Sequence, residues 1–199
     1  MTLDEAFARL TQAETAKGRY TAAYISALER GLASAMARRY APQGGREVRD
    51  QAYADAMRKL AREHARNADV LMLAAEAAMT LHARDYWAHD GAPRPWTPEI
   101  LAWLERALAL APGHPGANHY WVHAVEDSPE PQRALASADL LLRLCPGMGH
   151  LVHMASHVYL RAGRYRDATL ANQRAIEADR ARHGANAAYV EGYARHNVH

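Results

Sequence analysis

The sequence predicts an all-α protein that folds as an α-α superhelix, a solenoid in which helical hairpins stack on one another. Three observations predict this fold. Apolar residues make up 49% of the chain but Phe occurs only once, and the abundant Ala, Leu, Arg and Glu favour helices over strands. Apolar residues recur at helical spacing, and no stretch alternates apolar with polar residues as a strand would. The second half of the chain also repeats itself.

Helices are expected wherever the apolar residues keep this spacing, and turn residues separate them. Up to residue 145, the expected ranges include 21–41, 47–65, 68–87, 97–111 and 128–145. Thr97 is the expected N-cap of the helix over 97–111, with Pro98 at its first helical position. Ser128 and Pro129 repeat that design at the start of the helix over 128–145.

The repeat has a period of 34 residues, which relates several pairs of identical residues. The pairs are Leu110 and Leu144, Pro112 and Pro146, His119 and His153, His123 and His157, and Ala134 and Ala168. Because helix ends, core positions and histidines all share this period, chance does not explain it. Two helices in 34 residues is the length of a tetratricopeptide repeat.

The segment 150–180 also carries the residue types that such a repeat needs where its helices touch. They are small pairs, aromatic residues, glycine and alanine, at Ala155, Ser156, Tyr159, Gly163, Tyr165, Ala168 and Ala175. Small residues let two helices approach, tyrosines fill the remaining gap and glycine permits the turn. The match departs at Asn172, where a larger apolar residue is usual, and at Arg180, where proline is usual. The unit over 115–146 is a weaker match.

A single helical-repeat domain is therefore expected over 1–199. Its expected parts are degenerate helical hairpins over 1–96, repeat units over 97–146 and 147–181, and the start of a further, truncated unit over 182–199. Exposed apolar surface at such an uncapped C-terminal end would favour self-association.

Histidines gather on one face of the first helix of two consecutive units. At about 100° per residue, His150, His153 and His157 fall within an arc of roughly 60°. A separate stripe forms the expected packing face, at Val152, Ala155, Ser156 and Tyr159. The preceding unit places His119, His123 and Glu126 in a similar arc. Since first helices line the concave groove of a solenoid, both sets should face one cavity and point away from the partner helix.

Two further histidines, His196 and His199, lie three residues apart near the end of the chain. They fall on the same face if an insertion of about twelve residues precedes a further first helix that starts near Arg195.

The clustering favours a metal site, because neutral imidazoles at this helical spacing can converge on one ion. The candidate ligands are His119, His123, His150, His153, His157, His196 and His199. Glu126 is expected as a carboxylate ligand, as the acceptor that fixes an imidazole tautomer, or as an acid/base residue if the metal is catalytic. Tyr120 and Tyr159 are expected beside the metal site. Zinc, copper or iron would suit these ligands.

Two alternatives need no metal. In the first, the histidines are polar residues of a groove that grips an extended peptide or a partner helix, so that the protein is a protein-binding module. In the second, they are buried and bonded to one another and to the backbone. The remaining histidines are expected in solvent at helix ends or in loops, namely His64, His82, His89, His114 and His183.

Charge and cysteine content exclude several classes of protein. The 24 basic and 22 acidic residues give a net charge of +2, so neither nucleic acid nor a membrane surface is expected as a partner. Cys145 is the only cysteine, so no intramolecular disulfide forms. The N-terminus lacks the apolar core of a signal peptide, and no run of about 18 apolar residues exists. A cytoplasmic location is therefore expected if the N-terminus is native.

Three stretches, PGHPGANHYWVHAVEDSPEPQRAL, PGMGHLVHMASHVYLRAGRYRDA and GYARHNVH, resemble a family of bacterial tetratricopeptide-repeat proteins with a histidine-rich groove. The resemblance runs from about Arg19 to the end of the chain. It implies a superhelical fold and a longer protein, with a helical segment before this part and more helices after it. It supports the seven histidines and Glu126 as family-type positions, and it implies no particular reaction.

Overall fold

The structure is a computed structural model that describes residues 22–181 and residue 196, and its regular elements are helices. They are α2 (Ala22–Arg39), α3 (Arg46–Glu63), α4 (Ala68–Leu81), α5 (Thr97–Leu110), α6 (Pro115–Val125), the 3-10 turn η1 (Pro131–Ala134), α7 (Leu135–Leu144), α8 (Gly149–Arg161) and α9 (Tyr165–Ala181). In this part of the chain, pairing of strand type is limited to one bridge between Trp87 and Pro93. The all-α prediction is confirmed for these residues.

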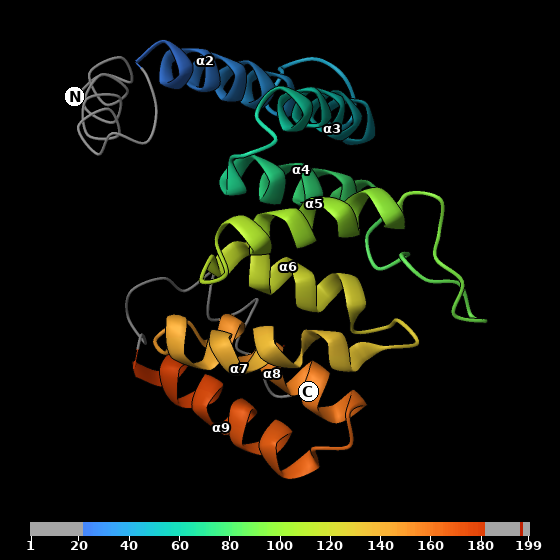
Figure 1. The fold of residues 1–199 in the computed structure, drawn as a ribbon, viewed down its shortest axis with the longest axis vertical. Helices are drawn as coiled ribbons and strands as arrows, with labels where there is room; N and C mark the ends of the chain where they lie inside the picture. The colour runs from blue at the N-terminus through green and yellow to red at the C-terminus, as the bar shows by residue number, and fades with distance from the viewer. Residues whose placement is uncertain (1–21, 182–195, 197–199) are drawn as a thin grey trace.

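The helices follow one another in chain order along the longest axis, from α2 and α3 at one end to α8 and α9 at the other (Figure 1). Each helix packs against the next, and α6 also contacts both α4 and α8. These three helices therefore form a row, with α6 in the middle. None of the described helices is long and apolar enough to cross a membrane.

Two apolar clusters hold the helices together. One joins α2 to α6 around residues such as Met57 and Val70, and the other joins α4 to α9 around residues such as Leu104, Leu141 and Met154. All five of these side chains are fully buried. The expected packing face of α8 is also buried, at Val152, Ala155, Ser156 and Tyr159.

Two of the expected N-caps are wrong. Trp96, not Thr97, is the N-cap of α5, and the buried hydroxyl of Thr97 donates instead to the carbonyl oxygen of Tyr86. Helix α7 begins at Leu135 rather than near Ser128. The hydroxyl of Ser128 accepts a hydrogen bond from the N–H of Glu130, and the prolines around that residue lack the N–H groups a regular helix needs.

Helix α4 ends at Leu81, so it is shorter than the helix expected over 68–87. Arg84 follows in the left-handed conformation, with φ of 59°, which no α-helix accommodates. The chain then turns back, and Tyr86 is buried in the core between α4 and α5.

Three histidines that were expected in solvent pack against the protein. His64 is buried edge-on against Tyr24, and His82 stacks on Trp96 with ring centroids 3.8 Å apart. His114 is the N-cap of α6, where its Nδ1 accepts from a backbone N–H. An imidazole combines an apolar ring with polar nitrogens, which suits it to helix ends that are partly covered. His89 is exposed as expected, and His183 lies outside the described residues.

Candidate metal centre

Helices α6 and α8 lie side by side and carry most of the candidate ligands. Gly149 allows the first turn of α8 to lie directly on α9, because a Cβ there would come within 2.8 Å of the carbonyl oxygen of Ala175. That close approach positions the backbone of the neighbouring His150 relative to α9. Helix α6 begins at Pro115, whose fixed φ suits the first helical position, and His119 follows one turn later.

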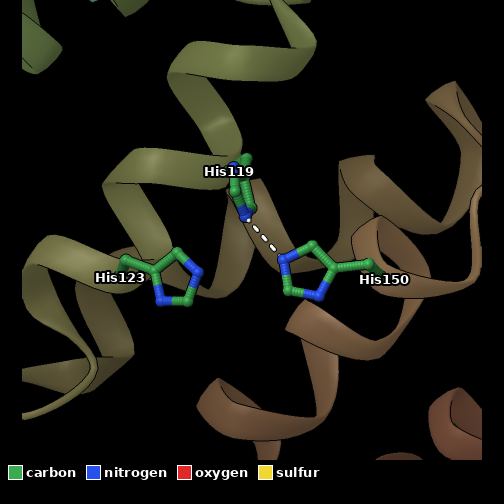
Figure 2. Close-up of side chains that lie close together, drawn as sticks. All are labelled: His119, His123 and His150. Carbon is green, nitrogen blue, oxygen red and sulfur yellow. Dashed lines mark hydrogen bonds between the residues drawn. The ribbon is translucent and has the colours of Figure 1, made fainter. Parts of the chain in front are cut away.

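The first group of histidines joins these two helices and consists of His119, His123 and His150. Figure 2 shows His119 and His123 on α6 and His150 on α8, with the three rings turned toward one another. One nitrogen from each ring lies within 4.8 Å of the other two. The Nε2 atoms of His119 and His150 are only 3.1 Å apart.

The second group consists of His153 and His157, which lie farther along α8, and of His196. One nitrogen from each ring again lies within 4.8 Å of the others. The Nε2 atoms of His153 and His157 are 2.9 Å apart, and the rings of His153 and His196 have centroids 4.7 Å apart. Six of the seven predicted ligands thus belong to one group or the other. His199 lies outside the described residues.

Glu126 lies between the two groups and contacts one histidine of each. Its Oε1 accepts a hydrogen bond from Nδ1 of His123 at 3.1 Å, and its Oε2 accepts one from Nδ1 of His157. Glu126 is 6% exposed, so these contacts are held away from bulk water. Of the three roles expected for Glu126, this geometry fits the acceptor that fixes imidazole tautomers.

Asn172 on α9 plays the same part for His153. Its Oδ1 accepts a hydrogen bond from Nδ1 of His153 at 2.8 Å. His153 is 2% exposed and faces its partner helix α9, so the expectation that all the histidines point away from that helix is wrong for this one. Sequence reasoning did not include Asn172 in the site. Its signal was present, because Asn172 is the position where 150–180 departs from the apolar residue of a tetratricopeptide repeat.

These acceptors determine which nitrogen of each ring carries the proton. A carboxylate and an amide oxygen only accept, so His123, His153 and His157 donate through Nδ1–H. In the neutral ring, Nε2 then holds a lone pair. The facing Nε2 atoms of His153 and His157 therefore present two lone pairs to each other at 2.9 Å, which is unfavourable unless a cation or an extra proton lies between them.

The electrostatics of the site favour neutral imidazoles. Burial, with some repulsion from neighbouring histidines, lowers the pKa of His119 and His150 to about 3. Burial also lowers the pKa of His153 to about 4. Burial alone would raise the pKa of Glu126, but the hydrogen bonds from His123 and His157 outweigh it and bring this pKa down to about 2. At neutral pH the neutral rings of His119, His150 and His153 thus lie in one site with a buried negative charge.

The spacing of the nitrogens fits a transition metal. Two nitrogens that bind one tetrahedral ion at about 2.0–2.1 Å lie roughly 3.3 Å apart. The two short Nε2 separations, 2.9 and 3.1 Å, are within a few tenths of an ångström of this value. Small rotations of the rings are enough to make up the difference. The geometry of both groups can therefore accommodate an ion bound by imidazole.

Both groups adjoin cavities. The larger, of about 570 Å³, is lined by all three histidines of the second group together with Asn172, Arg84 and Arg161. The smaller, of about 240 Å³, is lined by His123, Tyr120 and Glu126 among others. Arg84, Glu126 and Asp127 border both cavities. A small molecule in either cavity would lie beside the imidazole rings.

The two tyrosines expected beside the site differ in position. The ring of Tyr120 lies against that of His119, with centroids 4.8 Å apart. The hydroxyl of Tyr159 donates to Asp139 on α7, and Arg164 lies over its ring. The polar end of Tyr159 is therefore directed toward α7 and not toward the histidines.

Comparison with known proteins identifies no relative for this chain. No family model matches it, and neither the curated proteins nor the solved structures include a significant match. The resemblance to tetratricopeptide-repeat proteins stays a prediction from the sequence.

Proposed function

We propose that this protein binds a transition metal (zinc, copper or iron) through the histidines of α6, α8 and His196. The observation that carries the proposal is that the Nε2 atoms of His153 and His157 lie 2.9 Å apart. The Nδ1 atoms of the same two rings are held by Asn172 and Glu126. A carboxylate or amide that holds the far nitrogen of a ligating imidazole is a general feature of metal sites. A buried structural histidine would not need its lone pair aimed at a second lone pair.

The same proposal includes the scaffold. We infer that the paired helices are tetratricopeptide-type units of a superhelix, with α6 and α8 as first helices that line its groove. The 34-residue period and the contact of α6 with α8 support this arrangement. His119 and His153 occupy equivalent positions in consecutive units, as do His123 and His157.

A catalytic role for the metal is supported by two features. Three histidine ligands leave a coordination position for water or substrate, as in catalytic zinc sites. The cavity of about 570 Å³ next to the second group has room for a small molecule at that position. Because both oxygens of Glu126 accept hydrogen bonds from histidines, its orienting role is favoured over an acid/base role.

The alternative is a groove that binds a peptide without metal. One observation favours it, since the exposed side chains of Leu160 and Tyr165 line the larger cavity and offer apolar contacts. In that case the histidines would serve as hydrogen-bonding groups for the peptide backbone.

Elemental analysis decides between the two. The protein is purified without a histidine tag, incubated with Zn²⁺, with Cu²⁺, or with Fe²⁺ under reducing conditions, and then dialysed. Wild type is compared with the His119→Ala/His153→Ala double variant, and with His89→Ala as a control in an exposed histidine. Metal retained by wild type and by the control but lost by the folded double variant supports the proposal. Absence of retained metal in wild type contradicts it.

A further inference from the structure

We propose that the histidine cluster holds two metal ions, one in the group His119, His123 and His150 and the other in the group His153, His157 and His196, with Glu126 linking them. This inference rests on the proposed metal-binding function and deepens it. It concerns the number of ions and the assignment of ligands to each.

The supply of ligands is the first argument. The six histidines offer more nitrogens than one four-coordinate ion of the zinc type can bind. Their closest-lying ligand atoms also fall into two triads. Each group is defined by nitrogens within 4.8 Å of one another, and each contains one short pair of Nε2 atoms. The short pairs, His119 with His150 and His153 with His157, share no residue, so each pair can hold its own ion.

The position of Glu126 is the second argument. One carboxylate oxygen contacts His123 of the first group and the other contacts His157 of the second. With one ion placed in either group, only one of these contacts would orient a ligand of that ion. With one ion in each group, each of the two contacts orients a ligand of its own ion.

Charge is the third argument. Two dications placed in adjacent groups repel each other, and the repulsion is strong where water is excluded. Glu126 supplies a buried negative charge between the groups, which offsets part of this repulsion. The other charged side chains that line the cavities beside Glu126 are Arg84, Asp127, Arg161 and Glu76. Arg39 pairs with Glu76, and Asp127 is exposed. The buried Asp179 lies against Gly149. Glu126 is the buried carboxylate that contacts histidines of both groups.

The test is a count of bound ions. The tag-free chain is stripped with a chelator, titrated with Zn²⁺ alone in a calorimeter, and analysed for zinc after dialysis. Wild type is expected to bind two equivalents. His119→Ala removes a ligand of the first group and His196→Ala one of the second, and each is expected to reduce the count to one. The control His89→Ala should bind two.

The outcomes separate this inference from the proposed function. One equivalent in wild type would overturn the two-ion inference and leave the metal-binding function standing. Zero equivalents would overturn both. Because the wild-type count decides the matter by itself, the inference stays testable even if a variant does not fold. Loss of both ions in His119→Ala and also in His196→Ala, with the fold retained by circular dichroism, would contradict the assignment of three ligands to each ion.

Discussion

Nδ1 of His153 on α8 donates to Oδ1 of Asn172 on α9, at 2.8 Å. This contact joins two helices of one hairpin, and it sets the tautomer of a buried imidazole whose Nε2 faces His157. It gives a physical reason for a polar residue at this position of α9.

Replacing Asn172 with leucine should therefore weaken metal binding while the fold is kept. Asn172→Leu removes the acceptor and leaves His153 without a fixed tautomer, which typically costs about 10- to 100-fold in metal affinity. The measurement is a competition titration with a zinc indicator. Gln173→Leu, a similar change at the exposed neighbour, is the control. Equal affinity in Asn172→Leu and wild type would show that the contact is structural only.

Glu126→Gln should affect both groups of histidines. The amide keeps the shape of the side chain, but it is neutral, and its NH₂ cannot accept from an Nδ1–H. One of the two histidine contacts is lost and the buried negative charge disappears, so zinc affinity should fall by about 10-fold or more. Asp127→Asn makes the same chemical change at an exposed neighbouring position and should leave affinity close to wild type. An unchanged affinity in Glu126→Gln would argue against its linking role.

Removal of the metal should lower thermal stability. A ligand that binds only the folded state stabilises it by about 2.7 kcal/mol at a free concentration of 100 times its Kd. Stripping the protein with a chelator should lower Tm, and adding one metal back should restore it. The same treatment should leave the Tm of the His119→Ala/His153→Ala variant unchanged. A wild-type Tm that is insensitive to the chelator would favour the peptide groove.

Stability of the metal-free protein should fall in mild acid. The pKa values of His119, His150 and His153 lie below the ordinary value of 6.5 when the chain is folded, chiefly because of burial. The unfolded chain therefore binds more protons between pH 6.5 and about 4, and the free energy of unfolding decreases as the pH drops through this window. The lowered pKa of Glu126 adds a loss below pH 4.5. Urea unfolding at pH 7.5, 6.0 and 5.0 measures this effect. Stability that is flat across the three values would contradict the burial of neutral imidazoles.

Gly149→Ala should destabilise the fold near the first group. The added Cβ would meet Asp179 and the carbonyl oxygen of Ala175, so α8 must move away from α9. A misfit of this kind costs about 1–3 kcal/mol. Gly147→Ala is a matched control, because a Cβ at that position meets no other atom within 4 Å. Equal free energies of unfolding for the two variants would show that the close approach of α8 to α9 is not needed.

The sequence by itself determined the helical class and the residue types of the site. Helical spacing is a local property, so the apolar pattern and the 34-residue period were enough to predict helices and to place His119, His123 and Glu126 on one face. The packing face of α8 could be predicted for the same reason, and it is buried as expected.

Only the tertiary structure decided how these residues combine. The distance between nitrogens on α6 and α8 depends on how closely the helices pack, which no spacing within one helix contains. The division of the histidines into two groups, the contact of Glu126 with both and the bond from His153 to Asn172 all arise there. A contact outside the helix also decided the cap of α5, because the hydroxyl of Thr97 donates to Tyr86 instead of capping its own helix. Local sequence determines which residues share one face of a helix, and packing between helices determines which residues of other helices that face contacts.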